Sequence, residues 1–209
     1  MKKIILILAL VAATATTAMA QSTIGASFLN NVATTTVSSS SSTTTSEGFQ
    51  VGFDYIYGLD AKGFSVVPGV HYGYLTNSNA TSIGGVAGLS GKVQEHYLSI
   101  PVNFKYTVSP SKSFDLFAFA GPQFNFGIIS KTITTTTILG QSSTTTTDNY
   151  GDNSDYSRFD VAVGLGAGAD ISDMLRVSFS YNIGLLDRNS NDNITLKNNY
   201  WQVGAAFLF

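Results

Sequence analysis

Apolar and polar residues alternate with a period of two in eight short segments of the sequence, and this pattern constrains the fold most strongly. In the second of these segments, Phe49, Val51 and Phe53 share one face. Gln50 and Asp54 share the other. A period of two places successive side chains on opposite faces of a β-strand. We therefore predict eight strands, at 22–33, 48–58, 63–75, 93–109, 113–129, 158–172, 175–186 and 199–209.

The polar face of the predicted strands is made of glycine, serine, asparagine and glutamine, with few charges. Charged residues form only 11% of the chain, whereas a soluble domain carries about 25%. Small polar side chains suit the narrow lumen of a barrel better than a water-facing sheet surface. Beyond residue 20, the sequence has no apolar run approaching the roughly 20 residues of a transmembrane helix. Each alternating segment does reach the roughly 9–11 residues of a tilted membrane strand.

The connections between these segments alternate between long and short. The short ones are 59–62, the stretch around Pro110, and Ser172–Met174, and aromatic residues gather near both ends of the strands. Outer-membrane barrels combine long loops on one side with two aromatic girdles. We predict one all-β domain, residues 21–209, folded as an eight-stranded antiparallel up-and-down transmembrane β-barrel with both termini in the periplasm. The long connections are 34–47, 76–92, 130–157 and 187–198.

The N-terminus has the features of an export signal. Lys2 and Lys3 precede an apolar run, and Ala18 and Ala20 form the small-x-small pattern that signal peptidase accepts. We expect residues 1–20 to be a signal peptide cleaved after Ala20.

Composition argues against several classes of function. The chain has no cysteine, and its net charge of −2 lacks the basic excess that nucleic-acid binding requires. Asp187, Asn189 and Asn191 follow the start of a calcium loop, but Asp192 stands where glycine is needed. We therefore expect no metal, no cofactor and no nucleic acid.

The two histidines fall on opposite faces of their strands. The alternation points His71 into the lumen and His96 towards the lipid. A lipid-modifying hydrolase would need an outward serine next to an outward histidine. Pairing two strands across a turn at Pro110 sets His96 opposite Phe126. Glu95, next to His96 in the strand, points inward. We expect no enzymatic activity.

Four charged residues point into the periplasmic half of the predicted lumen. The short turn at Ser172–Met174 makes Asp170 and Arg176 cross-strand neighbours, and Lys105 and Asp115 lie diagonally across the Pro110 turn. A narrow interior must pair its buried charges. We interpret both pairs as structural neutralisation, with a proton or solute path as the alternative.

Runs of serine and threonine occupy two of the long connections. Threonine favours extended chain, so these connections can continue the strands as hairpins beyond the membrane. Such composition is typical of a hydrated spacer, and an adhesive or glycosylated surface is the alternative.

The last strand ends in a polar-x-Gly-x-x-aromatic-x-aromatic pattern formed by Gln202, Gly204, Phe207 and Phe209. It resembles the assembly signal that the outer-membrane insertion machinery reads by strand addition.

Several longer segments carry a family resemblance. They are YLSIPVNFKY (97–106), FAFAGPQFNFG (117–127), VAVGLGAGADI with LRVSFSYNIGLLD (161–187), and KNNYWQVGAAFLF (197–209). With these segments the chain resembles the Bacteroidetes outer-membrane β-barrel family that includes the PorT-type proteins. The resemblance covers residues 93–209 well and 22–75 by pattern. It implies the barrel, and in some members a role in protein secretion or gliding.

An eight-stranded barrel leaves an interior that side chains can fill, so a general diffusion pore is not expected. We predict a monomeric, non-enzymatic barrel that stabilises the envelope or binds an extracellular partner through its four long loops. The alternatives are a narrow channel or secretion-associated barrel and, less favoured, a lipid-active enzyme.

Overall fold

The computed structural model describes residues 21–59, 62–83, 87–152 and 154–209, which form nine antiparallel strands in one sheet. The predicted signal peptide, with Ala18 and Ala20, lies outside the described residues. Within the described part of the chain, no helix is long and apolar enough to cross a membrane. The strands are β1 (Gln21–Val37), β2 (Ser40–Gly58), β3 (Phe64–Ile83), β4 (Ala87–Ser111), β5 (Phe114–Ile138), β6 (Gln141–Asp148), β7 (Phe159–Ile171), β8 (Leu175–Gly184) and β9 (Ile194–Leu208).

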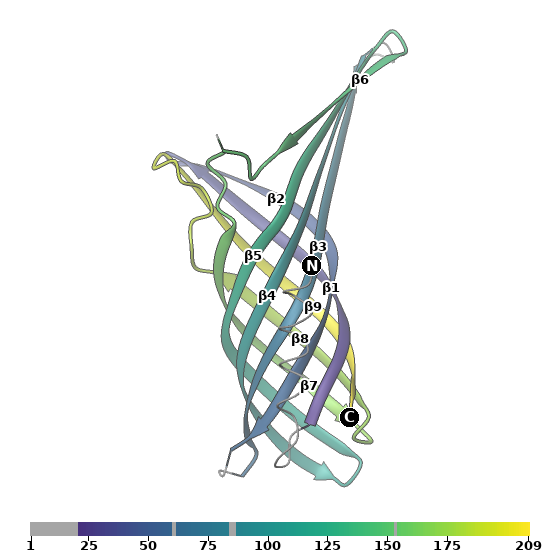
Figure 1. The fold of residues 1–209 in the computed structure, drawn as a ribbon, viewed down its shortest axis with the longest axis vertical. Coiled ribbons are helices and arrows are strands. Elements are labelled where there is room, and N and C mark those ends of the chain that lie inside the picture. The colour runs from purple at the N-terminus through teal and green to yellow at the C-terminus, as the bar shows by residue number, and fades with distance from the viewer. Residues whose placement is uncertain (1–20, 60–61, 84–86, 153) are drawn as a thin grey trace.

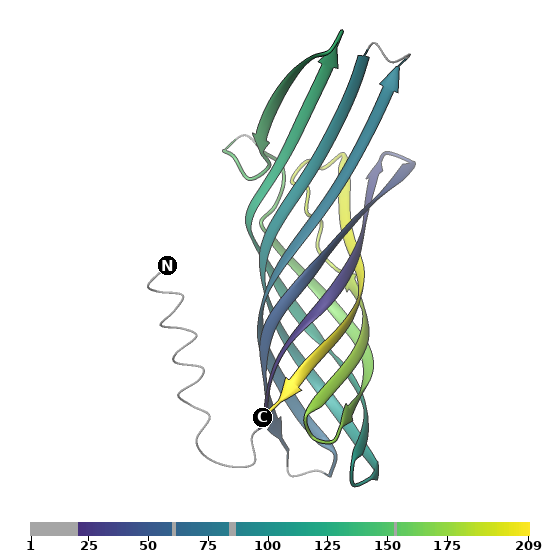
Figure 2. The same ribbon diagram turned by 90° about the vertical axis from the view of Figure 1, so that its right-hand side faces the viewer.

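Eight of the strands close a ring. Neighbours pair in the order β1, β2, β3, β4, β5, β7, β8, β9, and β9 pairs back onto β1 (Figure 2). The predicted fold, an eight-stranded antiparallel up-and-down barrel, is confirmed. The ninth strand, β6, lies outside the eight predicted segments, and it pairs with β5 outside the ring.

The serine- and threonine-rich connections are mostly strand. β1 and β2 stay paired up to Val37 and Ser40, and β5 and β6 up to Ile138 and Gln141. The predicted hairpins are therefore present, and only the turns at their tips are irregular. Gly140 occupies one of these tips with a φ of 80°, which suits glycine.

Four strands continue far beyond the barrel and form a sheet that Figure 1 shows rising from one side of its mouth. We call this sheet the extension. It consists of Asn77–Ile83 of β3, 87–93 of β4, 131–138 of β5, and β6. β3 lies at one edge of the extension, since its pairing with β2 ends at Thr76. β6 lies at the other.

The turn between β4 and β5 is not at Pro110, as predicted, but at Lys112–Ser113. Pro110 lies inside β4, in an irregular stretch of the β4–β5 ladder. Proline, which lacks an N–H, is tolerated at such an irregularity. The register therefore moves, and a further irregularity sets His96 opposite Ile129 instead of the predicted Phe126. The fourth long connection is also shorter than predicted, because β9 begins at Ile194.

The two faces of the barrel wall differ as the alternation predicts. Leu165 and Phe104 are 68% and 60% exposed on the outer face, whereas Ser99 and Gln50 are 0% and 2% exposed inside. A continuous apolar outer surface is too large for a soluble monomer and suits a bilayer. Aromatic pairs lie towards both ends of the wall: Phe28–Trp201, Phe49–Tyr74 and Phe126–Phe159 near the mouth, and Phe64–Tyr106 and Phe53–Phe209 near the short turns.

Replacing Val163 by arginine tests the assignment of the outer face. Val163 is exposed on β7 near the middle of the wall. The Val163→Arg substitution should cost about 2–4 kcal/mol of folding free energy because it exposes a charge to the bilayer. Denaturant unfolding in lipid vesicles measures this cost. Thr146→Arg, on the extension, is the matched control and should cost little. Equal costs for the two variants would mean that the outer face is wrongly assigned.

The neighbouring Gly164 faces the lumen, and serine there should cost less than serine at Val163 in the same measurement. A Cβ at Gly164 would come closest to the Asn182 side-chain oxygen, which is the movable end of its side chain. The rings of Phe117 and Phe119 pack over Gly168 and Gly166 instead.

Candidate functional site

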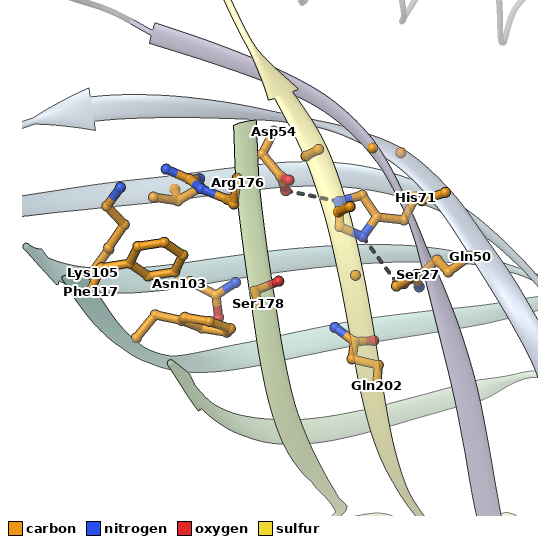
Figure 3. Close-up of a pocket in the computed structure, with 18 residues that line it drawn as sticks. Ser27, Gln50, Asp54, His71, Asn103, Lys105, Phe117, Arg176, Ser178 and Gln202 are labelled. Atoms are coloured by element: carbon orange, nitrogen blue, oxygen red, sulfur yellow. Dashed lines mark hydrogen bonds and ion pairs between the residues drawn. The ribbon is translucent and has the colours of Figure 1, made fainter. Parts of the chain in front are cut away.

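Among the described residues, two cavities lie in the barrel interior, and polar and apolar side chains line both. The lower one, towards the short turns, has a volume of about 110 Å³. The upper one, below the mouth, has a volume of about 30 Å³. Figure 3 shows side chains from several strands converging on the lower cavity, with Lys105 and Arg176 at one end and Gln50 and Gln202 at the other.

Asp170 is the centre of the charge cluster beside the lower cavity. Arg176 donates two hydrogen bonds to its carboxylate, from Nε to Oδ1 and from Nη2 to Oδ2, both 2.7 Å long. Lys105 Nζ donates a third at 3.2 Å. The Phe117 ring packs against both cations, 4.6 Å from Lys105 Nζ and 4.7 Å from Arg176 Cζ. The single carboxylate of Asp170 therefore partly compensates the charges of Lys105 and Arg176, and both cations also contact the ring of Phe117.

The structure places Asp170 opposite Arg176, as the short turn predicts. It does not place Lys105 against Asp115. The shifted β4–β5 register sets Lys105 opposite Phe119, and its ammonium reaches Asp170 instead. Asp115 lies opposite Asp170 on the neighbouring strand. The prediction of a Lys105–Asp115 pair is therefore wrong, because it rested on a turn at Pro110.

His71 points into the lumen, as predicted, and lies on the far side of the lower cavity. Its Nε2 is 2.8 Å from Asp54 Oδ1, and its Nδ1 is 3.2 Å from Gln50 Oε1. Thr23 Oγ1 donates to the other oxygen of Asp54 at 3.2 Å. Gln50 Nε2 is buried without a hydrogen-bond partner among the described residues, as is Gln202 Oε1. Buried amide atoms of this kind are normally satisfied by water, so the lower cavity suits ordered water.

A second cluster fills the mouth of the barrel. We call Glu95, Tyr150, Tyr156 and Arg188 the mouth cluster. Arg188 Nη2 and Tyr150 Oη donate to Glu95 Oε1 at 2.7 and 2.6 Å, and Tyr156 Oη donates to Oε2 at 3.1 Å. The two tyrosine rings stack with centroids 5.4 Å apart, and the Arg188 guanidinium lies 4.3 Å from the centre of the Tyr156 ring.

The mouth cluster joins two loops to the barrel wall. Glu95 comes from β4, the tyrosines come from the loop after β6, and Arg188 comes from the loop after β8. The loops are also bonded to each other, because Ser157 N donates to Arg188 O and Ser190 N donates to Asp155 O, both at 2.8 Å. Together they form one lid over the lumen.

The sequence reasoning missed this cluster, although it turned Glu95 inward. An inward carboxylate needs a positive partner. Arg158 and Arg188 are the arginines in the two loops concerned. The inward Glu95 could therefore have suggested an ion pair with a loop arginine. The sequence alone does not show which of the two arginines forms it.

Burial governs the ionisation of the mouth cluster. Burial raises the pKa of the Tyr150 and Tyr156 hydroxyls, and the charge of Glu95 raises both further. Burial alone would lower the pKa of Arg188, but the charge and hydrogen bond of Glu95, together with the Tyr156 and Tyr150 hydroxyls, outweigh burial and raise it. At neutral pH Arg188 is therefore charged and the two tyrosine hydroxyls are neutral.

The oxygens considered for calcium are engaged with backbone groups. Asp187 Oδ1 accepts hydrogen bonds from the N–H groups of Asn189 and Leu196, and Asn189 Oδ1 accepts one from Asn191. These bonds shape the loop that carries Arg188.

His96 lies on the outer face near the mouth, as predicted. Its Nδ1 bonds to the Tyr72 hydroxyl, its ring packs 4.9 Å from that of Tyr74, and Ile129 is opposite on β5. Ser130 faces inward and is 1% exposed. The described residues therefore do not give His96 the outward serine that an acyl hydrolase needs.

The residues of the predicted assembly signal lie on both faces of β9 and directly after its end. Phe207 and Phe209 are exposed on the outer face, and Gln202 and Gly204 line the lower cavity. The signal itself stays a prediction.

Removing the carboxylate of the mouth cluster should open the lid. Glu95→Ala leaves Arg188 buried without its counter-charge, which is strongly unfavourable. Trypsin should then cut after Arg188 in the refolded variant and spare it in the wild type. Asp152→Ala, at an exposed acid in the same lid, is the control and should behave as the wild type. If Arg188 is cut equally in all three proteins, the cluster does not hold the lid.

The raised tyrosine pKa values predict an alkaline loss of lid stability. The unfolded hydroxyls ionise at about pH 10, below the pKa of the folded ones, so their contribution is complete below pH 10 and falls above it. As the pH is raised, tyrosinate absorption should increase in two phases. In the double variant Tyr150→Phe/Tyr156→Phe, the second phase, at higher pH, should be smaller. An unchanged later phase would contradict the assignment.

Comparison with known proteins gives one family and several solved structures. A family model described as outer membrane protein beta-barrel domain matches residues 5–209. Ail, the attachment invasion locus protein of Yersinia pestis, crystallised with the heparin analogue sucrose octasulfate, is 14% identical, with 92% of this chain and 100% of that chain covered and a TM-score of 0.45. Neisserial surface protein A is 12% identical, with 88% of this chain and 96% of that chain covered and a TM-score of 0.42. The outer membrane enzyme PagL is 14% identical, with 84% of this chain and 97% of that chain covered and a TM-score of 0.42. No curated protein matches the sequence.

Proposed function

Because the chain belongs to the outer membrane protein beta-barrel domain family, it is a barrel of the bacterial outer membrane, and we propose that it is a non-enzymatic surface-binding protein. In this proposal the barrel is an anchor, the termini lie in the periplasm, and the extension is the binding element outside the cell. Its partners are then the lipid bilayer, the outer-membrane assembly machinery and an extracellular molecule.

The observation that carries this proposal is the contrast between a lumen obstructed near both ends and strands that continue far outside it. The mouth cluster lies across one end of the lumen, and Asp170 with its two cations lies near the other. Four strands nevertheless continue well past the aromatic residues at the mouth. A barrel that served only as a membrane wall would not need a sheet of this length outside it.

The chemistry of the extension suits recognition by hydrogen bonds. Following the register from inward Glu95 and Ser130, one of its faces has no charged residue and presents threonine, serine and asparagine with a few aliphatic side chains. On the other face, Lys92, Lys131 and Asp148 lie at the end nearest the barrel.

A trimmed barrel tests the role of the extension. Deleting 80–90 and 135–144 and closing each hairpin with Asn-Gly keeps Asn79 opposite Gly91 and Thr134 opposite Thr145. Cells displaying the wild type should be retained on surfaces coated with polysaccharide or matrix protein. Cells with equal amounts of the trimmed barrel should be retained no better than cells without it. Equal retention of wild type and trimmed barrel on every surface would contradict the proposal.

A narrow channel or secretion-associated barrel, as the PorT-type resemblance suggests, is the second candidate. Its support is the polar interior, in which Gln50, Gln202, Asp160 and Tyr200 have buried atoms without described partners. Planar-bilayer recordings separate the two candidates. We expect the wild type to show no steady conductance and Glu95→Ala to show openings. A steadily open wild-type channel would favour the second candidate.

A further inference from the structure

The strongest unassigned feature of the molecule is the free edge of β6. In the described structure β6 pairs with β5 alone, and all eight of its residues are exposed. Its sequence, QSSTTTTD, has no lysine or proline, and its ladder with β5 has no register shift. Natural edge strands are usually protected by such residues or by bulges, and an unprotected edge is a template for another strand.

The pairing of β5 with β6 shows that a strand rich in serine and threonine pairs with another strand of the same composition. Thr135 Oγ1 lies 3.0 Å from Thr144 Oγ1, and Thr137 Oγ1 lies 2.8 Å from Ser142 Oγ. Hydroxyl pairs of this type stabilise antiparallel strands. The same contact recurs between β1 and β2, where Thr36 and Ser41 are 2.9 Å apart. Strands rich in serine and threonine thus pair with each other repeatedly in this chain.

We propose that the partner of this edge is β6 of a second copy of the chain, added in the antiparallel direction. The inference rests on the proposed function and names the partner and the contact. With Thr145 on the two-fold axis, the single charged residue, Asp148, lies opposite Ser142 of the other copy, and Thr144 lies opposite Thr146. Like charges do not oppose each other, and every remaining pair consists of two hydroxyl side chains. The contact is two-fold symmetric and closes on itself.

The direction of β6 decides where the second copy lies. β5 runs outwards to the tip of the extension, and β6 runs back towards the barrel (Figure 1). An antiparallel partner runs the opposite way, so its barrel lies beyond the tip, in a facing membrane. Each barrel stays a monomer in its own membrane, and the paired edges join two membrane surfaces.

Vesicle tethering tests the contact. Vesicles that carry the purified full chain should cluster, measured as a rise in light scattering, and should disperse after the extension is trimmed. Thr144→Lys with Thr146→Lys places two charges on the edge strand and should abolish clustering. Thr135→Lys with Thr137→Lys places the same charges on β5, inside the sheet, and should leave clustering unchanged. Absence of clustering by the wild type, or equal effects of the two double variants, would overturn the proposal.

The absence of cysteine allows a direct second measurement. Ser143→Cys is placed in one vesicle population and Thr147→Cys, the residue opposite it across the contact, in another, each with a distinguishable tag. Oxidation should give disulfide-linked heterodimers only when the two populations are mixed. Dimers that form as readily within one unmixed population of either variant would overturn the facing arrangement.

These vesicles contain only the chain and lipid, so they separate this inference from the proposed function. If they do not cluster, while cells still need the extension for retention on coated surfaces, the pairing of copies is wrong and surface binding stands. If they cluster, while retention does not depend on the extension, the pairing stands and binding to other surfaces is wrong.

Discussion

A closed ladder of backbone hydrogen bonds is the constraint on which the structure depends. Inside a bilayer, an unpaired N–H or C=O costs several kcal/mol, so strands can cross only as a ring without edges. The eight-strand ring meets this condition, with β9 pairing back onto β1. Where the chain leaves the membrane the condition ends. The ring then opens into hairpins and a four-stranded sheet with free edges.

The closed ring also determines the chemistry of the interior. Eight strands leave a narrow lumen in which every charge must find a partner. Asp170 bonds to Arg176 and Lys105 near the short turns, and Glu95 bonds to Arg188 and two tyrosines at the mouth. The two clusters differ in origin. The lower one comes from the wall itself, whereas the upper one ties two loops to the wall and covers the lumen.

The extension forms because residues that favour extended chain continue along four strands beyond the bilayer. Threonine and serine favour extended chain but supply no apolar face, so the strand segments of the extension need neither lipid nor a core. Their hydroxyls pair across the strands instead. Such a sheet has two exposed faces and unsatisfied edges, which are the features of a surface that binds.

The sequence by itself determined the ring, the faces of its strands, and the neighbours Asp170 and Arg176. All of these follow from a period of two and a short turn, which act between residues close in the chain. Only the tertiary structure decided the register of β4 against β5, and with it the partner of Lys105, because a ladder irregularity near Pro110 moved the turn. It alone also brought Arg188 to Glu95, 93 residues apart, since loop contacts depend on closure of the whole ring.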